Sequence, residues 1–374
     1  MTVRFLHTSD LHIGKRFGNL PEDLRGRLRE ARHTVIDRLA AQARAHNTDI
    51  VLLAGDTFDT ETPSPQVLRQ ALAAIGGHGD LRWVILPGNH DSLAAEELWE
   101  QIRRSKPENL LLALDAEPLW LTPQAVVLPA ACTARRPGRD LTAWMENYDT
   151  GAAVRIGLAH GAIQNFSEDG IGTDVIAPNR ASLADLDYLA LGDWHGLKEI
   201  NAKTWYSGTP EPDRFKHNRP GQALIVSIPG RGAAPEVTTV DTGVFEWRTL
   251  ALELFSGDDP AERLDTRLPP GSLRRQVLLR VAASGRTTLP GRTALTLAVA
   301  AVEPEFAHVA LDEDQLTTDC DTTDLELIDH AGALREAAET LLAETQNPTL
   351  DAPSRTVARD ALVRLFTYCE AIQA

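Results

Sequence analysis

The chain has 374 residues, of which 43% are apolar and 24% are charged, with 26 glycines, 22 prolines and 3 cysteines. This is the composition of an ordinary globular protein with room for more than one core, which excludes a disordered chain, a collagen-like repeat and a small disulfide-stapled domain. The formal net charge of −16 argues against a passive DNA-coating protein, but it is compatible with an enzyme whose cleft holds metal cations and a few arginines.

The sequence also bears on membranes and secretion. Uncharged apolar runs such as residues 50–54 and 294–302 are far shorter than the ~20 residues of a membrane-spanning helix. The first residues lead straight into a strand pattern, without the basic and small-residue segments of a secretory signal. We therefore expect a cytoplasmic protein that does not contact membranes.

From residue 1 to about 245, short apolar runs typical of strands alternate with helical patterns. The predicted strands are residues 3–6, 50–53, 83–86, 125–128, 154–159, 188–191 and 223–228. Between them, residues 21–46 and 65–75 carry apolar side chains at helical spacing and are predicted to be helices. The alternation predicts a layered α/β domain over residues 1–245.

The pattern changes near residue 245. Strand patterns at 245–254 and 275–281, with an apolar run at 290–301 that is ambiguous between helix and strand, predict a small α+β domain over residues 246–321. Residues 322–374 are predicted to form two helices separated by 347–354, with Ser354 or Thr356 as an N-cap. The last helix carries an apolar stripe of Val357, Ala361, Leu365, Cys369 and Ile372.

Five polar clusters follow predicted strands at or near their carboxyl ends. They are Asp10-Leu-His12, Gly55-Asp56-Thr-Phe-Asp59, Gly88-Asn89-His90-Asp91, His160-Gly161 and Gly192-Asp193-Trp-His195. In an open α/β sheet these strand ends face a common crevice, so the clusters can converge. Asp10 and His12, two residues apart, are expected to point to the same side by strand alternation and to chelate one ion.

The residue types in these clusters indicate a metal-dependent reaction. Histidine, aspartate and asparagine without cysteine suit Mn²⁺, Fe²⁺ or Zn²⁺, and Gly55 and Gly88 permit tight turns beside the candidate ligands. Two ions that share one carboxylate lie roughly 3.5–4 Å apart, where both can contact a phosphoryl group and acidify a water. Each cluster alone is more often an ordinary turn, but together they indicate phosphoester hydrolysis.

The order of the clusters resembles that of the calcineurin-like metallophosphoesterases, and within them the SbcD-type DNA repair nucleases. The matching segments are Phe5-Leu-His-Thr-Ser-Asp-Leu-His-Ile-Gly14, Leu53-Ala-Gly-Asp-Thr-Phe-Asp59, Pro87-Gly-Asn-His-Asp91, Asp187-Tyr-Leu-Ala-Leu-Gly192 and Tyr206-Ser-Gly-Thr-Pro210. The resemblance covers residues 1–220. Beyond residue 220, it concerns mainly the order of the parts, a small cap followed by helices. It implies an α/β layered metallophosphoesterase sandwich with a small α+β cap domain and C-terminal helices.

The resemblance also implies an activity and roles for single residues. The activity is that of a Mn²⁺-dependent DNA exonuclease or endonuclease that works in DNA repair with a coiled-coil ATPase of the SbcC type. The expected ligands of the two ions, with Asp56 as the bridge, are Asp10, His12, Asp56 and His195 for one and Asp56, Asn89, His160 and Asp193 for the other. His90 matches the family's catalytic histidine, a general acid for the leaving oxygen, and Asp91 is expected to orient its ring.

Two positions depart from the family pattern. Asp193 stands where the family has histidine; a carboxylate also binds metals and favours harder ions such as Mn²⁺ or Mg²⁺, so we expect an intact but retuned second site, with a weakened site as the alternative. Asp59 stands where repair nucleases often carry a histidine near the substrate, and we expect Asp59 to contact the substrate. Arg214 and Lys216, which follow residues 206–210, are expected to bind the nucleic-acid backbone.

Two other functions stay open. The same metals could serve a nucleotide or another small phosphodiester, which the acidic charge favours. A scaffold with weakened catalysis is the second alternative, and the retention of His90 and most ligands argues against it. For partners, we expect DNA and the ATPase, the latter bound by the helices at 322–374 unless these helices only pack on each other; a homodimer is also open.

Overall fold

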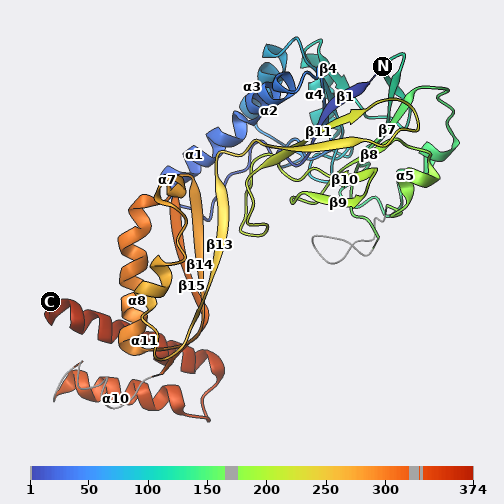
Figure 1. The fold of residues 1–374 in the computed structure, drawn as a ribbon. Helices are drawn as coiled ribbons and strands as arrows, with labels where there is room; N and C mark the ends of the chain where they lie inside the picture. The colour runs from blue at the N-terminus through green and yellow to red at the C-terminus, as the bar shows by residue number, and fades with distance from the viewer. Residues whose placement is uncertain (1, 165–175, 320–327, 329–331, 374) are drawn as a thin grey trace. The chain divides into compact units, whose positions relative to one another are not determined.

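A computed structural model describes residues 2–164, 176–319, 328 and 332–373 of the chain. The chain divides into two compact units, Met1–Glu246 and Trp247–Ala374, and Figure 1 labels several elements of each. The first unit has the layered α/β architecture that the sequence predicts. The predicted boundary between residues 321 and 322 lies outside the described residues, and the division of the second part into two domains stays a prediction.

The first sheet carries three of the five polar clusters. Its strands, in spatial order, are β12 (Glu236–Asp241), β11 (Gln222–Ile228), β1 (Val3–Thr8), β2 (Ile50–Leu53), β3 (Arg82–Ile85) and β4 (Leu110–Leu112). Strands β1 to β4 run parallel, and β11 pairs antiparallel with β1. The carboxyl ends of β1, β2 and β3 therefore lie side by side at one edge.

The second sheet carries the other two clusters. Its order is β5 (Leu119–Thr122), β6 (Ala125–Ala130), β7 (Val154–His160), β8 (Tyr188–Gly192), β10 (Thr204–Tyr206) and β9 (Lys198–Asn201). Strands β6, β7, β8 and β10 are parallel. Apolar side chains of both sheets, such as Phe5 and Val84 from the first and Ile156 and Tyr188 from the second, share one core. The sheets therefore pack face to face.

Helices cover the outer face of the first sheet. Leu39 of α2 (Val35–Ala45), Leu72 of α3 (Pro65–Gly77) and Trp99 of α4 (Glu96–Ser105) pack in one core with residues of that sheet. On the second sheet, the short helices η1 (Ala143–Asn147) and α5 (Arg180–Leu183) contribute Met145 and Ala181 to a third core. The first unit is thus built in layers around two sheets.

The single helix predicted over residues 21–46 is wrong. The structure has α1 (Glu22–His33) and α2, with Thr34 between them at φ −78° and ψ 1°. The hydroxyl of Thr34 donates to the carbonyl oxygen of Glu30 at 3.0 Å. Threonine in a helix makes such local bonds and bends or ends it. The apolar spacing continues across this break, which is why periodicity alone did not reveal it.

The second unit contains a three-stranded sheet of β13 (Glu246–Leu254), β14 (Val277–Thr288) and β15 (His308–Asp319), in that order. Its short helices are α6 (Pro260–Asp265), α7 (Gly271–Arg274) and η2 (Glu303–Glu305). The ambiguous run at 290–301 is helix α8 (Leu289–Val302), which begins where the side chain of Thr288 accepts the N–H of Gly291. Proline in the first turn suits this helix start.

Two terminal helices, α10 (Ala333–Gln346) and α11 (Ala352–Gln373), pack on each other and on Leu289 of α8. The predicted N-cap is wrong, because α11 begins two residues before Ser354, and Asp351 accepts the N–H of Ser354 at 2.9 Å. Among the described residues, no helix is long and apolar enough to span a bilayer.

The predicted stripe on α11 is also shifted. Val357 is 69% exposed, whereas the buried positions are Ala358, Leu362, Phe366 and Cys369. The side chain of Ile372 lies outside the described part of the chain. The buried face is therefore offset by one residue over most of the helix.

Candidate metal centre

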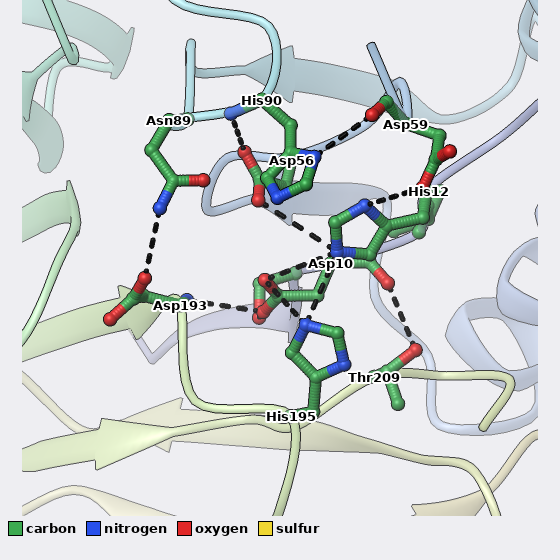
Figure 2. Close-up of polar contacts among 12 residues, drawn as sticks. Asp10, His12, Asp56, Asp59, Asn89, His90, Asp193, His195 and Thr209 are labelled. Atoms are coloured by element: carbon green, nitrogen blue, oxygen red, sulfur yellow. Dashed lines mark hydrogen bonds and ion pairs between the residues drawn. The ribbon is translucent and has the colours of Figure 1, made fainter. Parts of the chain in front are cut away.

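The turns after five strands bring the predicted ligands together. Asp10 follows β1, Asp56 follows β2 and Asn89 follows β3, while His160 ends β7 and Asp193 follows β8. Figure 2 shows side chains from these turns pointing toward one another. The expected convergence of the clusters at strand ends is confirmed.

The turns use left-handed backbone. The angle φ is +56° at Asp10, +44° at His12, +53° at Asp56 and +103° at Asp193. Residues with a side chain seldom adopt these angles, and functional sites are where such strain is retained. Strand alternation is therefore the wrong reason for the approach of Asp10 and His12, because β1 ends at Thr8. The turn beyond the strand brings His12 Nε2 to 4.0 Å from Asp10 Oδ1.

Two glycines allow these segments to approach. A Cβ on Gly88 would lie 2.1 Å from Oδ1 of Asp56, and a Cβ on Gly55 would lie 2.2 Å from Nδ1 of His160. Close packing leaves no room for such atoms. Gly55 also has a φ of +90°, which glycine adopts without strain. The roles expected for both glycines are confirmed.

The first ligand group consists of Asp10, His12, Asp56 and His195. The Nε2 atoms of His12 and His195 are 3.2 Å apart, and Oδ1 of Asp10 lies 4.0 Å from the former and 3.8 Å from the latter. Oδ2 of Asp56 is 3.8 Å from Nε2 of His12. All four residues are buried, so their ligand atoms converge in a space shielded from solvent.

The second ligand group consists of Asp56, Asn89, His160 and Asp193. Nε2 of His160 lies 3.5 Å from Oδ2 of Asp56 and 3.9 Å from Oδ1 of Asp193. The amide nitrogen of Asn89 donates to Oδ1 of Asp193 at 3.2 Å. Nδ1 of His160 is 2.8 Å from the carbonyl oxygen of Ala54, and this acceptor fixes the proton on Nδ1 and leaves Nε2 for a ligand role.

Several of these atoms have no hydrogen-bond partner within the described part of the chain. They are Oδ1 of Asp10, Oδ1 of Asn89 and Nε2 of His160. Buried polar atoms without partners cost free energy and call for an ion, a water or a ligand. Mixed oxygen and nitrogen donors suit a borderline or hard divalent cation. The residues present therefore fit a divalent metal centre.

Burial and mutual contacts shift the pKa values at this centre. Burial alone would raise the pKa of Asp56, but the imidazole of His160 and other nearby histidines outweigh burial and hold this pKa below its ordinary value. Burial would lower the pKa of His160, and Asp56 reverses this effect. Burial, reinforced by Asp10 and Asp56, raises the pKa of Asp193 to about 6. A cation beside Asp193 would lower that pKa again.

His90 borders both groups, and its ring is held by the backbone. Nδ1 of His90 lies 2.8 Å from the carbonyl oxygen of Asp59, which can only accept a hydrogen bond, so Nδ1 carries the proton. The prediction that Asp91 orients this ring is wrong, because its carboxylate accepts the N–H groups of Phe58 and Gly88. Asp91 instead ties the turn after β3 to the turn after β2.

The predicted substrate contacts Arg214 and Lys216 lie just outside the ligand groups. Nε of Arg214 donates to Oδ1 of Asp213 at 3.1 Å, and this side chain is 42% exposed. Nζ of Lys216 lies 5.4 Å over the ring of Trp194. Their contact with a substrate stays a prediction.

Two acids flank the first ligand group, and the sequence interpretation named only Asp59, as a substrate contact. Oδ1 of Asp59 lies 3.4 Å from Nδ1 of His12, and Oδ1 of Asp213 lies 3.4 Å from Nδ1 of His195. Nζ of Lys15 is 2.7 Å from Asp213 and 3.7 Å from Asp59. The one sequence signal for Asp213 is its place shortly after residues 206–210.

A groove of about 850 Å³ opens beside Asp59. Its lining includes Arg16, Arg29 and His33, together with Glu30. The arginines are exposed. Two arginines and two acids, Asp59 and Glu30, therefore line a concave surface next to the candidate centre.

Two face-to-face sheets with a buried set of candidate metal ligands at their strand ends are typical of a metal-dependent phosphoesterase. Residues 3–227 match the model of the calcineurin-like phosphoesterase family. The chain belongs to this family, as the order of its motifs indicates. The match ends within β11, so the second unit lies outside it.

Among characterised relatives, the chain is similar to the SbcD component of the nuclease SbcCD. The Bacillus subtilis (strain 168) protein is 26% identical over 298 residues, which cover 69% of this chain and 71% of that one. The Escherichia coli (strain K12) protein is 38% identical over 100 residues, 25% of this chain and 22% of that one. YhaO, an uncharacterized metallophosphoesterase of B. subtilis, is 28% identical over 226 residues, 54% of this chain and 50% of that one. The resemblance to SbcD-type nucleases is confirmed, and it supports a metal-dependent nuclease.

Proposed function

We propose that this chain is the nuclease component of a DNA repair complex and that it hydrolyses phosphodiester bonds with two Mn²⁺ ions. The observation that carries the proposal is that the two ligand groups share Asp56. Its Oδ2 lies 3.8 Å from Nε2 of His12 in one group and 3.5 Å from Nε2 of His160 in the other. A shared carboxylate of this kind lets two ions lie roughly 3.5–4 Å apart and contact one phosphoryl group.

The residues have distinct tasks in this mechanism. The first ligand group would hold one ion and the second ligand group the other, and the bound metals would supply Lewis acidity to the phosphate and acidify a water. His90 lies at the border of both groups with the proton on Nδ1 fixed by the carbonyl of Asp59, so a second proton, on Nε2 of the imidazolium form, is the one that the ring can give to the leaving oxygen. Asp91 keeps the turn that carries Asn89 and His90 in place through Gly88.

The groove beside Asp59 favours a polymeric substrate. Arg16, Arg29 and His33 line it, and arginine binds phosphate oxygens in a bidentate manner. The net charge of −16 favours the alternative, a nucleotide or another small phosphodiester, because a long polyanion is repelled more strongly. A direct comparison of DNA with a small phosphodiester as substrates distinguishes these two functions.

The test uses the full chain with Mn²⁺ on single-stranded DNA, double-stranded DNA and bis(4-nitrophenyl) phosphate. We expect all three to be cleaved, EDTA to abolish cleavage, and Asp56→Ala to lose activity to background because both groups lose a ligand. Asp80→Asn is the control, since Asp80 pairs with Arg44 on the exposed surface. Full activity in EDTA or in Asp56→Ala would refute the two-metal mechanism, and cleavage of the small ester alone would favour the alternative substrate.

We further propose that a coiled-coil ATPase binds this chain through α10 and α11. The similar proteins from B. subtilis and E. coli are named as subunits of the nuclease SbcCD. In this chain the helical pair buries only part of its apolar surface: Leu334, Val357 and Tyr368 are 47%, 69% and 68% exposed. Exposed apolar side chains on helices suit a contact with a partner helix.

Co-purification with a co-expressed SbcC-type ATPase tests this partner. Val357→Glu combined with Tyr368→Glu should abolish co-purification and keep hydrolysis of bis(4-nitrophenyl) phosphate, as should truncation after residue 322. Leu273→Glu on α7, where Leu273 is 47% exposed, is the matched control. Unchanged binding by the double variant would place the contact elsewhere.

A further inference from the structure

The two histidines of the first ligand group face each other through like atoms. Nε2 of His12 and Nε2 of His195 are 3.2 Å apart, with Oδ1 of Asp10 at 4.0 and 3.8 Å from them. Two neutral imidazoles can lie this close in two ways: one donates an N–H to the other, or two lone pairs converge on a cation. The position of the proton on each ring decides between the two arrangements.

On the far side of each ring, Nδ1 has a carboxylate as its polar neighbour. Oδ1 of Asp59 lies 3.4 Å from Nδ1 of His12, a contact drawn in Figure 2, and Oδ1 of Asp213 lies 3.4 Å from Nδ1 of His195. We call Asp59 and Asp213 the outer carboxylates. An ionised carboxylate accepts hydrogen bonds and donates none, so each outer carboxylate favours the proton on Nδ1 of its histidine.

One lysine connects the outer carboxylates. Nζ of Lys15 lies 2.7 Å from Oδ2 of Asp213 and 3.7 Å from Oδ1 of Asp59. Each carboxylate thus lies between the lysine and one imidazole, and the lysine offsets part of the charge that two acids would place beside the metal ligands. The three residues come from separate segments, which the fold brings to the same side of the first ligand group.

We propose that Lys15, Asp59 and Asp213 are positioning residues that hold His12 and His195 with the proton on Nδ1. Both Nε2 atoms then present lone pairs, together with Asp10, to one divalent cation. This inference rests on the proposed metal centre. It gives Asp59 a role through His12 instead of the substrate contact expected from the sequence. Partners of this kind orient metal-binding histidines and increase their basicity.

Mn²⁺ binding to the full chain, followed by calorimetry and electron paramagnetic resonance, is the first test. We expect Asp59→Asn and Asp213→Asn each to weaken binding of one ion by about 10- to 100-fold, and Asp80→Asn to leave both ions unchanged. If the wild-type chain binds no Mn²⁺, the proposed function fails and this inference fails with it. If the wild-type chain binds two ions and both variants bind them equally well, only this inference is overturned.

The proton positions are the second test, and they do not depend on whether the variants fold. Nitrogen-15 NMR of the full chain, labelled at histidine and loaded with Zn²⁺ as a diamagnetic probe, should show the proton on Nδ1 for both His12 and His195. Asp213→Asn should change the NMR signals of His195 and spare those of His12, and Asp59→Asn should do the reverse. A proton on Nε2 of either ring in the wild-type chain would overturn the proposal.

Discussion

At the scale of single residues, His90 can be separated from the ligands around it. Nδ1 of its ring lies 2.8 Å from the backbone carbonyl oxygen of Asp59. We expect His90→Ala to keep Mn²⁺ affinity and to lose about 10²–10⁴-fold in kcat, the usual contribution of general acid catalysis. Calorimetry measures the Mn²⁺ affinity, and steady-state kinetics measures kcat. A loss of Mn²⁺ binding would instead make His90 a ligand.

Asp193 determines the expected metal preference of the second ligand group. Its Oδ1 lies 3.9 Å from Nε2 of His160 and accepts from Asn89 at 3.2 Å. We expect Asp193→His to keep the fold and to shift the best rate from Mn²⁺ toward ions that prefer nitrogen ligands, such as Zn²⁺. Rates with each metal and anomalous diffraction from Mn²⁺-soaked crystals measure this. A fully occupied second ion with Asp193 turned away would contradict the assignment.

His7 belongs to the core and confers a dependence of stability on pH. Its Nδ1 lies 3.1 Å from the Tyr188 hydroxyl and its Nε2 lies 3.2 Å from the Leu191 carbonyl. Burial lowers its pKa from 6.5 to about 3. Between about pH 3 and pH 6.5, the unfolded chain therefore binds a proton at His7 that the folded chain does not bind. Burial of neutral His7 thus costs no stability above about pH 6.5, and the free energy of unfolding decreases as the pH drops from there toward 3.

His7→Gln should lessen that acid sensitivity, because glutamine cannot take up the proton. Urea denaturation of both proteins at pH 7.5 and pH 5 measures the difference. An equal loss of stability in both proteins on acidification would show that other groups cause it.

Short motifs beside strand ends made the ligand candidates predictable. The side chains that contact these ligands from distant segments were not predictable. Asp10, His12 and Asp56 stand in recognisable clusters. Asp213 meets His195 only through the fold, and nothing in its local sequence indicates an ion pair with Lys15. Local sequence indicates which residues end strands, but side-chain partners between distant segments depend on the complete fold.

At the scale of elements, the buried strands of the first unit that were predicted lie within a few residues of their expected bounds, because most of their side chains are apolar. The second strand, Ile50–Leu53, is buried throughout. Helix limits were less predictable: Thr34 divides a continuous apolar pattern, and the face of α11 was offset by one residue. A helix with apolar residues on several sides has no unique buried face until its neighbours are placed.

The offset on α11 gives a test with a matched control. Phe366 is 1% exposed in the core with Ile328 and Ala338, whereas Val357 is 69% exposed. We expect Phe366→Ala to lower the free energy of unfolding of the second unit by about 3–5 kcal/mol, and Val357→Ala to change it by less than about 0.5 kcal/mol. Chemical denaturation measures both. A larger effect of Val357→Ala than of Phe366→Ala would mean that the buried face is the one predicted from the sequence.

At the scale of the whole molecule, both ligand groups come from the first of the two compact units. A ligand that binds only folded protein stabilises it by about 2.7 kcal/mol at 100 times its dissociation constant. We expect calorimetry to show two transitions, of which EDTA lowers only the one that belongs to Met1–Glu246. A single transition that EDTA lowers as a whole would show that the units unfold together.

The place of β1 has a consequence for protein synthesis. This strand precedes the other strands of its sheet along the chain, yet it lies between β2 and β11 (Gln222–Ile228) in that sheet, and Asp10, just after it, shares the first ligand group with His195. A nascent chain on the ribosome therefore waits for most of the first unit before β1 has both neighbours. Because the ligand set is incomplete until then, the growing chain should stay without hydrolytic activity until the unit is nearly finished.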